Sequence, residues 1–186
     1  TKLSGNDATV QCGEIQYVEQ GSLVDVWSQQ SKLIASDAAS NDEFGLSVSL
    51  SGDYAITGAN SGDQRPGSAY IFKRSGTSWS QQAKLQASDG ATSDRFGKAV
   101  ALSGDYAVIG AYADDDSPNN SGSAYIFKKD TGAETWTQQA KLIASDAAAS
   151  DNFGWYVDIS GDIAVIGAYN EDPGGVSNAG SAYIFE

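Results

Sequence analysis

Residues 96–111 read FGKAVALSGDYAVIGA, and this stretch decides the fold class. Phe96, Val100 and Leu102 alternate with small residues, which predicts a strand over 96–102 with one bulky and one small face. The following Ser-Gly-Asp has the residues of a tight hairpin turn. It leads into residues 106–111, which are apolar on both faces. Because such a strand must be covered on both sides, we expect a neighbouring unit above and below it.

This stretch occurs three times in the chain. Residues 44–59 read FGLSVSLSGDYAITGA, and residues 153–168 read FGWYVDISGDIAVIGA. Each copy is followed by Gly-Ser-Ala-Tyr-Ile-Phe, and a Trp-Ser/Thr-Gln-Gln segment begins at Trp27, Trp79 and Trp136. The second unit is longer than the first, and its additional residues fall in two loops, 114–120 and 130–135. Insertions confined to loops indicate a structural repeat. Residues 3–5 and 21–26 resemble parts of a fourth, degenerate copy.

Each unit divides into four short strands, which in the second unit cover 96–102, 106–111, 123–127 and 136–144. The fourth has one fully polar face, so it is expected to be outermost. We predict an all-β fold, a β-propeller built of four-stranded antiparallel blades. A β-sandwich or an open β-solenoid is the structural alternative. The predicted single repeat domain covers 1–186: a degenerate partial blade over 1–36, blades over 37–88 and 89–145, and a blade without its outer strand over 146–186.

The pair Phe96-Gly97, followed by Gly110-Ala111, resembles the FG-GAP repeat of integrin α-subunit propellers and of many bacterial and fungal extracellular proteins. The resemblance implies a propeller serving adhesion, carbohydrate binding or scaffolding. Integrin-like members bind calcium in an Asp-rich loop between the first two strands. Only the short turn Ser51-Gly52-Asp53 and its equivalents occupy that place here, so this calcium site is not carried over.

Composition narrows the classes of partner. The chain has 186 residues, 24 acidic and 11 basic, and its net charge of -13 disfavours nucleic acid and anionic membranes. It contains no apolar run of about 20 residues, so membrane insertion is not expected. Without histidine it lacks the usual general base and zinc ligand, and we expect no enzyme activity. The single Cys12 excludes an internal disulfide; it is either a small apolar strand residue or a cross-link to a second chain.

Acidic side chains suggest two further roles. Asp114, Asp115, Asp116 and Asn119 form a candidate calcium site in the loop after a second strand, since oxygen ligands suit a hard cation. The alternative is a solvated acidic loop. Asn119 also begins a possible N-glycosylation sequon. Aspartates that recur before each Phe-Gly are expected to accept backbone N–H bonds and fix the connection between blades: Asp37, Asp89 and Asp146, with Asp42, Asp94 and Asp151.

We expect a secreted, extracellular module for adhesion or structural assembly through protein–protein contacts. Its expected partners are other protein chains, in a homo-oligomer or a longer repeat array. The alternative is a lectin-like propeller that binds glycans. In that case Tyr112, Trp155 and Tyr169 would stack on a sugar face. Packing between blades is the other explanation of these three aromatic residues.

Overall fold

The computed structural model describes residues 27–61, 65–115 and 120–186. Within these ranges the chain is all-β, with three antiparallel sheets and one short 3-10 turn, Pro173–Gly175. The first sheet contains β1 (Val48–Ser51), β2 (Tyr54–Ala59), β3 (Ser68–Ser75) and β4 (Ser78–Leu85). The second contains β5 (Ala99–Ser103), β6 (Tyr106–Ala111), β7 (Ser123–Lys129) and β8 (Trp136–Leu142). The third contains β9 (Phe153–Ser160), β10 (Ile163–Ala168) and β11 (Ser181–Phe185).

Strand order follows the sequence in the first two sheets, so β4 and β8 are edge strands, as their polar faces predicted. The second strand of the motif lies at 106–111, as expected. The first begins at Ala99 and not at Phe96. Gly97, with a φ of 91°, precedes this start, although the equivalent Gly154, with a φ of 88°, lies inside β9. Phe96 instead forms an isolated parallel bridge with Gly67 of the first sheet.

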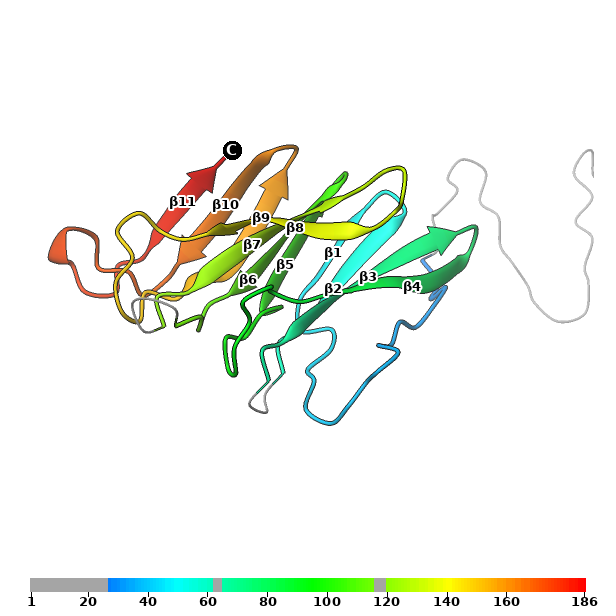
Figure 1. Cartoon of the computed structure of the whole chain (residues 1–186), viewed down its shortest axis with the longest axis horizontal. Coiled ribbons are helices and arrows are strands. Elements are labelled where there is room, and N and C mark those ends of the chain that lie inside the picture. Colours follow the sequence, from blue (N-terminus) through cyan, green and yellow to red (C-terminus); the bar gives the residue numbers. More distant parts are fainter. Residues whose placement is uncertain (1–26, 62–64, 116–119) are drawn as a thin grey trace, which may run out of the picture.

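The three sheets stand side by side in a row (Figure 1). The first strand of each later sheet makes the connection, because β5 contacts β1 and β2, and β9 contacts β5 and β6. The first and third sheets lie at opposite ends of the row, and the described sheets do not close into a ring. The predicted degenerate copy falls largely outside the described residues, and Cys12 lies outside them as well.

The core lies between the sheets. Val100, Leu102 and Ile109 of the second sheet pack against Ile56 and Ile71 of the first. On its other side, the second sheet packs Ala101, Val108 and Ala124 against the third sheet. β6 is therefore buried on both faces, as its two-sided apolar sequence predicted.

Paired glycines set the spacing between sheets. A Cβ built on Gly58 of β2 would lie 1.9 Å from the carbonyl oxygen of Gly97, and a Cβ on Gly110 of β6 would lie 1.9 Å from that of Gly154. Both distances are far inside van der Waals contact, so no side chain fits at Gly58 or Gly110. We call this pairing, in which a Phe-Gly carbonyl rests on the glycine of the preceding Gly-Ala, the glycine joint.

Candidate interaction surfaces

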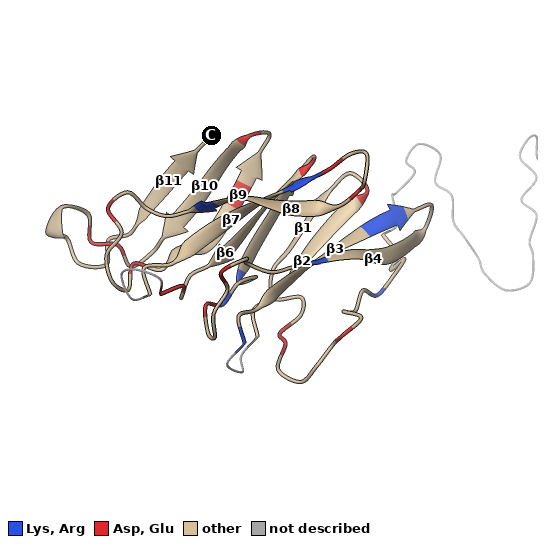
Figure 2. Ribbon diagram, in the orientation of Figure 1, with Lys and Arg blue, Asp and Glu red and all other residues tan. Residues whose placement is uncertain are grey.

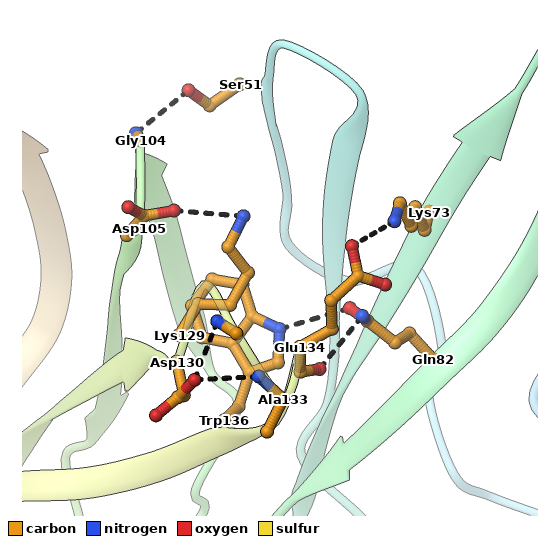
Figure 3. A network of polar contacts seen from close by, with 11 residues as sticks. Ser51, Lys73, Gln82, Gly104, Asp105, Lys129, Asp130, Ala133, Glu134 and Trp136 are labelled. Atoms are coloured by element: carbon orange, nitrogen blue, oxygen red, sulfur yellow. Dashed lines mark hydrogen bonds and ion pairs between the residues drawn. The ribbon is translucent and has the colours of Figure 1, made fainter.

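Polar side chains also link the first two sheets, at their outer edge (Figure 3). Lys73 of β3 forms an ion pair with Glu134, and Gln82 donates a hydrogen bond of 2.9 Å to the Glu134 carbonyl. The indole of Trp136 donates to Gln82 at 3.2 Å. Glu134 belongs to the loop 130–135, which the sequence marks as an insertion. Through Glu134, this loop therefore links the second sheet to the first.

Serine hydroxyls link the first strands of neighbouring sheets. The backbone N–H groups of Val100 and Leu102 donate to Ser47 Oγ at 3.0 Å and Ser49 Oγ at 3.1 Å. Between the second and third sheets, Gly161 N–H donates to Ser103 Oγ at 2.9 Å. Hydroxyl acceptors on one sheet therefore receive backbone donors from the next.

Recurring aspartates before the Phe-Gly pair have two roles. The nearer one of each pair accepts a backbone N–H three residues back, at 2.5 to 2.7 Å, as predicted; these bonds run to Asp42, Asp94 and Asp151 from Ala39, Ala91 and Ala148. The more distant one binds side chains, contrary to the expectation. Asp37 accepts from the Tyr70 hydroxyl at 2.9 Å and pairs with Lys84 at 2.7 Å. The reason is that β3 and β4 bring tyrosine and lysine to the same edge.

These contacts shift the pKa values of the groups involved. The hydrogen bonds from Lys84 and Tyr70 hold the pKa of Asp37 below its usual value. Burial favours the neutral form of Asp89, but the hydrogen bonds from Lys141 and Tyr125 together with the charge of Lys141 outweigh it, so the pKa of Asp89 is also lowered. Burial, and then the hydrogen bond to Asp146, raises the pKa of Tyr183. Asp37 and Asp89 are therefore charged, and Tyr183 is protonated, at neutral pH.

Asp114, the first residue of the candidate calcium site, is buried with an exposed fraction of 3%. Its carboxylate accepts a hydrogen bond of 2.6 Å from Tyr125 and pairs with Lys141 at 2.9 Å. Asp115 is exposed, whereas Asp116 and Asn119 lie outside the described residues. The calcium site and the glycosylation at Asn119 therefore stay predictions. In the described part of the chain, no three His, Cys, Asp or Glu side chains are close enough to share a metal ion.

The three aromatic residues predicted to bind sugar lie together between the second and third sheets. The ring of Trp155 is 4.2 Å from that of Tyr112 and 4.7 Å from that of Tyr169, measured between centroids. Lys98 Nζ lies 4.8 Å from the Trp155 centroid. The interplanar angle of 63° shows that Tyr112 meets Trp155 edge to face, and the angle of 58° shows that the ring of Tyr169 is tilted against it. We call Tyr112, Trp155, Tyr169 and Lys98 the aromatic cluster. The sequence analysis did not include Lys98, because the repeat pattern does not show that Lys98 lies next to Trp155 of the following repeat.

Apolar side chains are exposed at the two ends of the row. The front face is the side of the first sheet that looks away from the second. There Val48 is 70% exposed, whereas Val100 at the same motif position is 5% exposed. The back face is the outward side of the third sheet. There Ile184 is 67% exposed, whereas its counterpart Ile71 is fully buried. The repeated motif predicts a neighbouring unit on both sides of a sheet, and it does not distinguish a middle repeat from a terminal one.

The motif itself can be compared with known families. A model of the FG-GAP repeat matches the chain at residues 27–72, 79–127 and 136–185, which is more than half of its length. The chain belongs to the FG-GAP repeat family. The resemblance expected from the sequence is thereby confirmed. No curated protein sequence matches this FG-GAP chain.

The structure explains the glycines of the FG-GAP motif in this chain. The glycine after Phe96 or Phe153 and the glycine before Ala59 or Ala111 belong to neighbouring repeats and form the two glycine joints. FG-GAP repeats are typical of extracellular proteins, are generally non-catalytic and suggest a propeller-like module for protein interaction. Among the described residues of this FG-GAP chain, no helix is long and apolar enough to cross a membrane.

Acidic residues lie mainly in the loops and hairpin turns that join the strands (Figure 2). The strands at the two ends of the row carry fewer acidic residues than the loops, although Asp158 of β9 is exposed. Their exposed apolar residues include Val48, Leu50, Ile163 and Ile184. Exposed apolar side chains that gather on one face are typical of a protein interface.

Proposed function

We propose that this chain is a secreted, non-catalytic module for adhesion or structural assembly, and that its end faces make the protein–protein contacts. The exposure of apolar residues at motif positions that are otherwise buried carries this proposal. On the front face, Val48 and Leu50 are 70% and 65% exposed, and their counterparts Val100 and Leu102 are almost fully buried. Burying such side chains against a partner is favourable, at about 25 cal/mol for each Å² of apolar surface. Closing of the blades into a complete propeller is part of the same proposal.

Adhesion of coated beads tests this function. Beads carrying the purified chain are expected to adhere to a surface coated with at least one protein, from a panel of purified extracellular proteins and the chain itself. The double substitution Val48→Glu with Leu50→Glu should reduce adhesion about tenfold or more, because it places two charges in the apolar contact. Bound beads are counted after washing.

Ile143→Glu is the matched control, because Ile143 is 55% exposed but follows β8 at a lateral edge, away from both end faces. It should adhere like the unmodified chain. Failure of the unmodified chain to adhere to any coat, or equal adhesion by the double variant, would contradict the proposed function.

Glycan binding is the second candidate, and the gathering of the aromatic cluster favours it. Tyr169 is 46% exposed, and Trp155 lies against Tyr112 and Tyr169 from two neighbouring sheets. Exposed aromatic rings beside polar groups are a common way to hold a sugar. The packing of the rings against one another equally fits a role in holding the sheets together.

A sugar titration separates these two roles. If the aromatic cluster binds glycans, millimolar amounts of at least one sugar in a panel should change the tryptophan fluorescence of the chain. Trp155→Ala should then abolish binding measured by calorimetry, and Ile143→Glu should retain it. No heat and no fluorescence change with any sugar would leave the cluster with a packing role alone.

A further inference from the structure

The glycine joint has two halves, and among the described residues each end of the row carries one half that no other described residue engages. In the two joints within the chain, the glycine of a Gly-Ala pair lies against the carbonyl oxygen of the next Phe-Gly. Gly167 is the third Gly-Ala glycine. The nearest atom to a Cβ built there is Tyr156 Cβ of the same sheet, 3.7 Å away. Gly45 is the first Phe-Gly glycine, and a Cβ built there meets nothing within 4 Å.

Apolar positions on the two end faces match those that meet in the internal joints. Between the first and second sheets, Ile71 packs in the same cluster as Val100 and Leu102. The back face presents Ile184 at the position of Ile71, and the front face presents Val48 and Leu50 at the positions of Val100 and Leu102. At these apolar positions each face carries the side chains that its internal counterpart buries, whereas Tyr156 and Asp158 on the back face stand where the first sheet has Ser47 and Ser49.

Hydrogen-bonding groups are matched in the same way. Gly104 N–H donates to Ser51 Oγ at 3.1 Å, and Gly161 N–H donates to Ser103 Oγ at 2.9 Å. Ser160 holds the third such position and is exposed on the third sheet. Gly52, at the position of Gly104 and Gly161, is exposed on the first sheet. The Gly52 N–H donor and the Ser160 hydroxyl acceptor therefore lie at opposite ends of the row of sheets.

We propose that the back face of the third sheet binds the front face of the first sheet in a second copy of this chain, head to tail. The contact repeats the internal joint: the Gly45 carbonyl lies on Gly167, Val48 and Leu50 pack near Ile184, and Gly52 N–H donates to Ser160 Oγ. The inference rests on the proposed function and names its partner. The two halves of the joint lie on different faces, so the contact is heterologous and either closes a ring or extends a chain of copies. Two copies contribute six described sheets, which is within the range of known propellers, about four to eight blades.

Solution mass by light scattering tests the proposal. The unmodified chain, of 19.3 kDa, is expected to show at least twice that mass, increasing with concentration if copies add in a chain. Gly167→Val on the back face and Val48→Glu on the front face should each weaken association about tenfold or more. In the single chain Val48 is 70% exposed and a Cβ on Gly167 meets Tyr156 Cβ only at van der Waals distance, 3.7 Å, so circular dichroism should show an unchanged fold. Ile143→Glu should associate like the unmodified chain.

Mixing the two variants identifies the head-to-tail geometry. Gly167→Val retains an intact front face and Val48→Glu retains an intact back face, so an equimolar mixture should form a dimer that neither forms alone. A mixture that stays monomeric, while the unmodified chain associates, would overturn the head-to-tail contact. A single-chain mass at every concentration of the unmodified chain would overturn the inference altogether. The proposed function would survive that last result if beads still adhere to another protein through the front face.

Discussion

Gly110→Ala should lower the free energy of unfolding by about 3 kcal/mol or more, which is among the largest effects expected of any single substitution in the chain. The added Cβ would lie 1.9 Å from the Gly154 carbonyl oxygen, which is backbone and cannot rotate away. The third sheet would therefore have to separate from the second. Chemical denaturation followed by circular dichroism measures the loss.

Gly167→Ala provides the matched control, because it makes the same change in the same Ile-Gly-Ala sequence of the third sheet. Its Cβ meets only Tyr156 Cβ at 3.7 Å, an ordinary van der Waals contact. We expect the free energy of unfolding to change by less than about 1 kcal/mol, measured at a concentration where the chain is monomeric. Equal losses for Gly110→Ala and Gly167→Ala would show that the destabilisation comes from the strand itself and not from the glycine joint.

Features carried by local pattern could be predicted from the sequence. The hairpin at residues 103–105 and the two-sided burial of 106–111 follow from residues that are adjacent in the chain. The backbone bonds to Asp42 and Asp94 do too, because they span three residues. The family follows from the repeated motif, which the match to the FG-GAP model confirms.

Features that depend on how the sheets stack could not be predicted. The side-chain partners of Asp37 come from β3 and β4, at a spacing that only the folded sheet sets. The loop 130–135 was visible as an insertion, but the pairing of Glu134 with Lys73 depends on the distance between two sheets. The open arrangement of the three sheets could not be predicted for the same reason, since the same motif occurs in a middle and in a terminal repeat.

Stacking also governs the exposed end faces, and this connects the fold to the proposed function. A repeat that is buried on both sides contributes stability, whereas the same repeat at an end presents its apolar side chains to solvent. Repeat proteins usually end in terminal repeats whose outer face is polar. The front and back faces are therefore the two surfaces of the chain at which a partner gains the most apolar burial.

Phe96→Ala should cost about 3 to 5 kcal/mol of unfolding free energy, because the Phe96 ring is fully buried between two sheets. It meets Tyr125 and Phe127 edge to face, at 5.5 and 6.1 Å between centroids. Phe44 makes nearly the same ring contacts, 5.6 and 6.1 Å, but is only half-buried, at the front face. Phe44→Ala should therefore cost about half as much in the monomeric chain. Thermal and chemical denaturation measure both losses. Equal losses for Phe96→Ala and Phe44→Ala would contradict the view that packing against a preceding sheet makes Phe96 the more important ring.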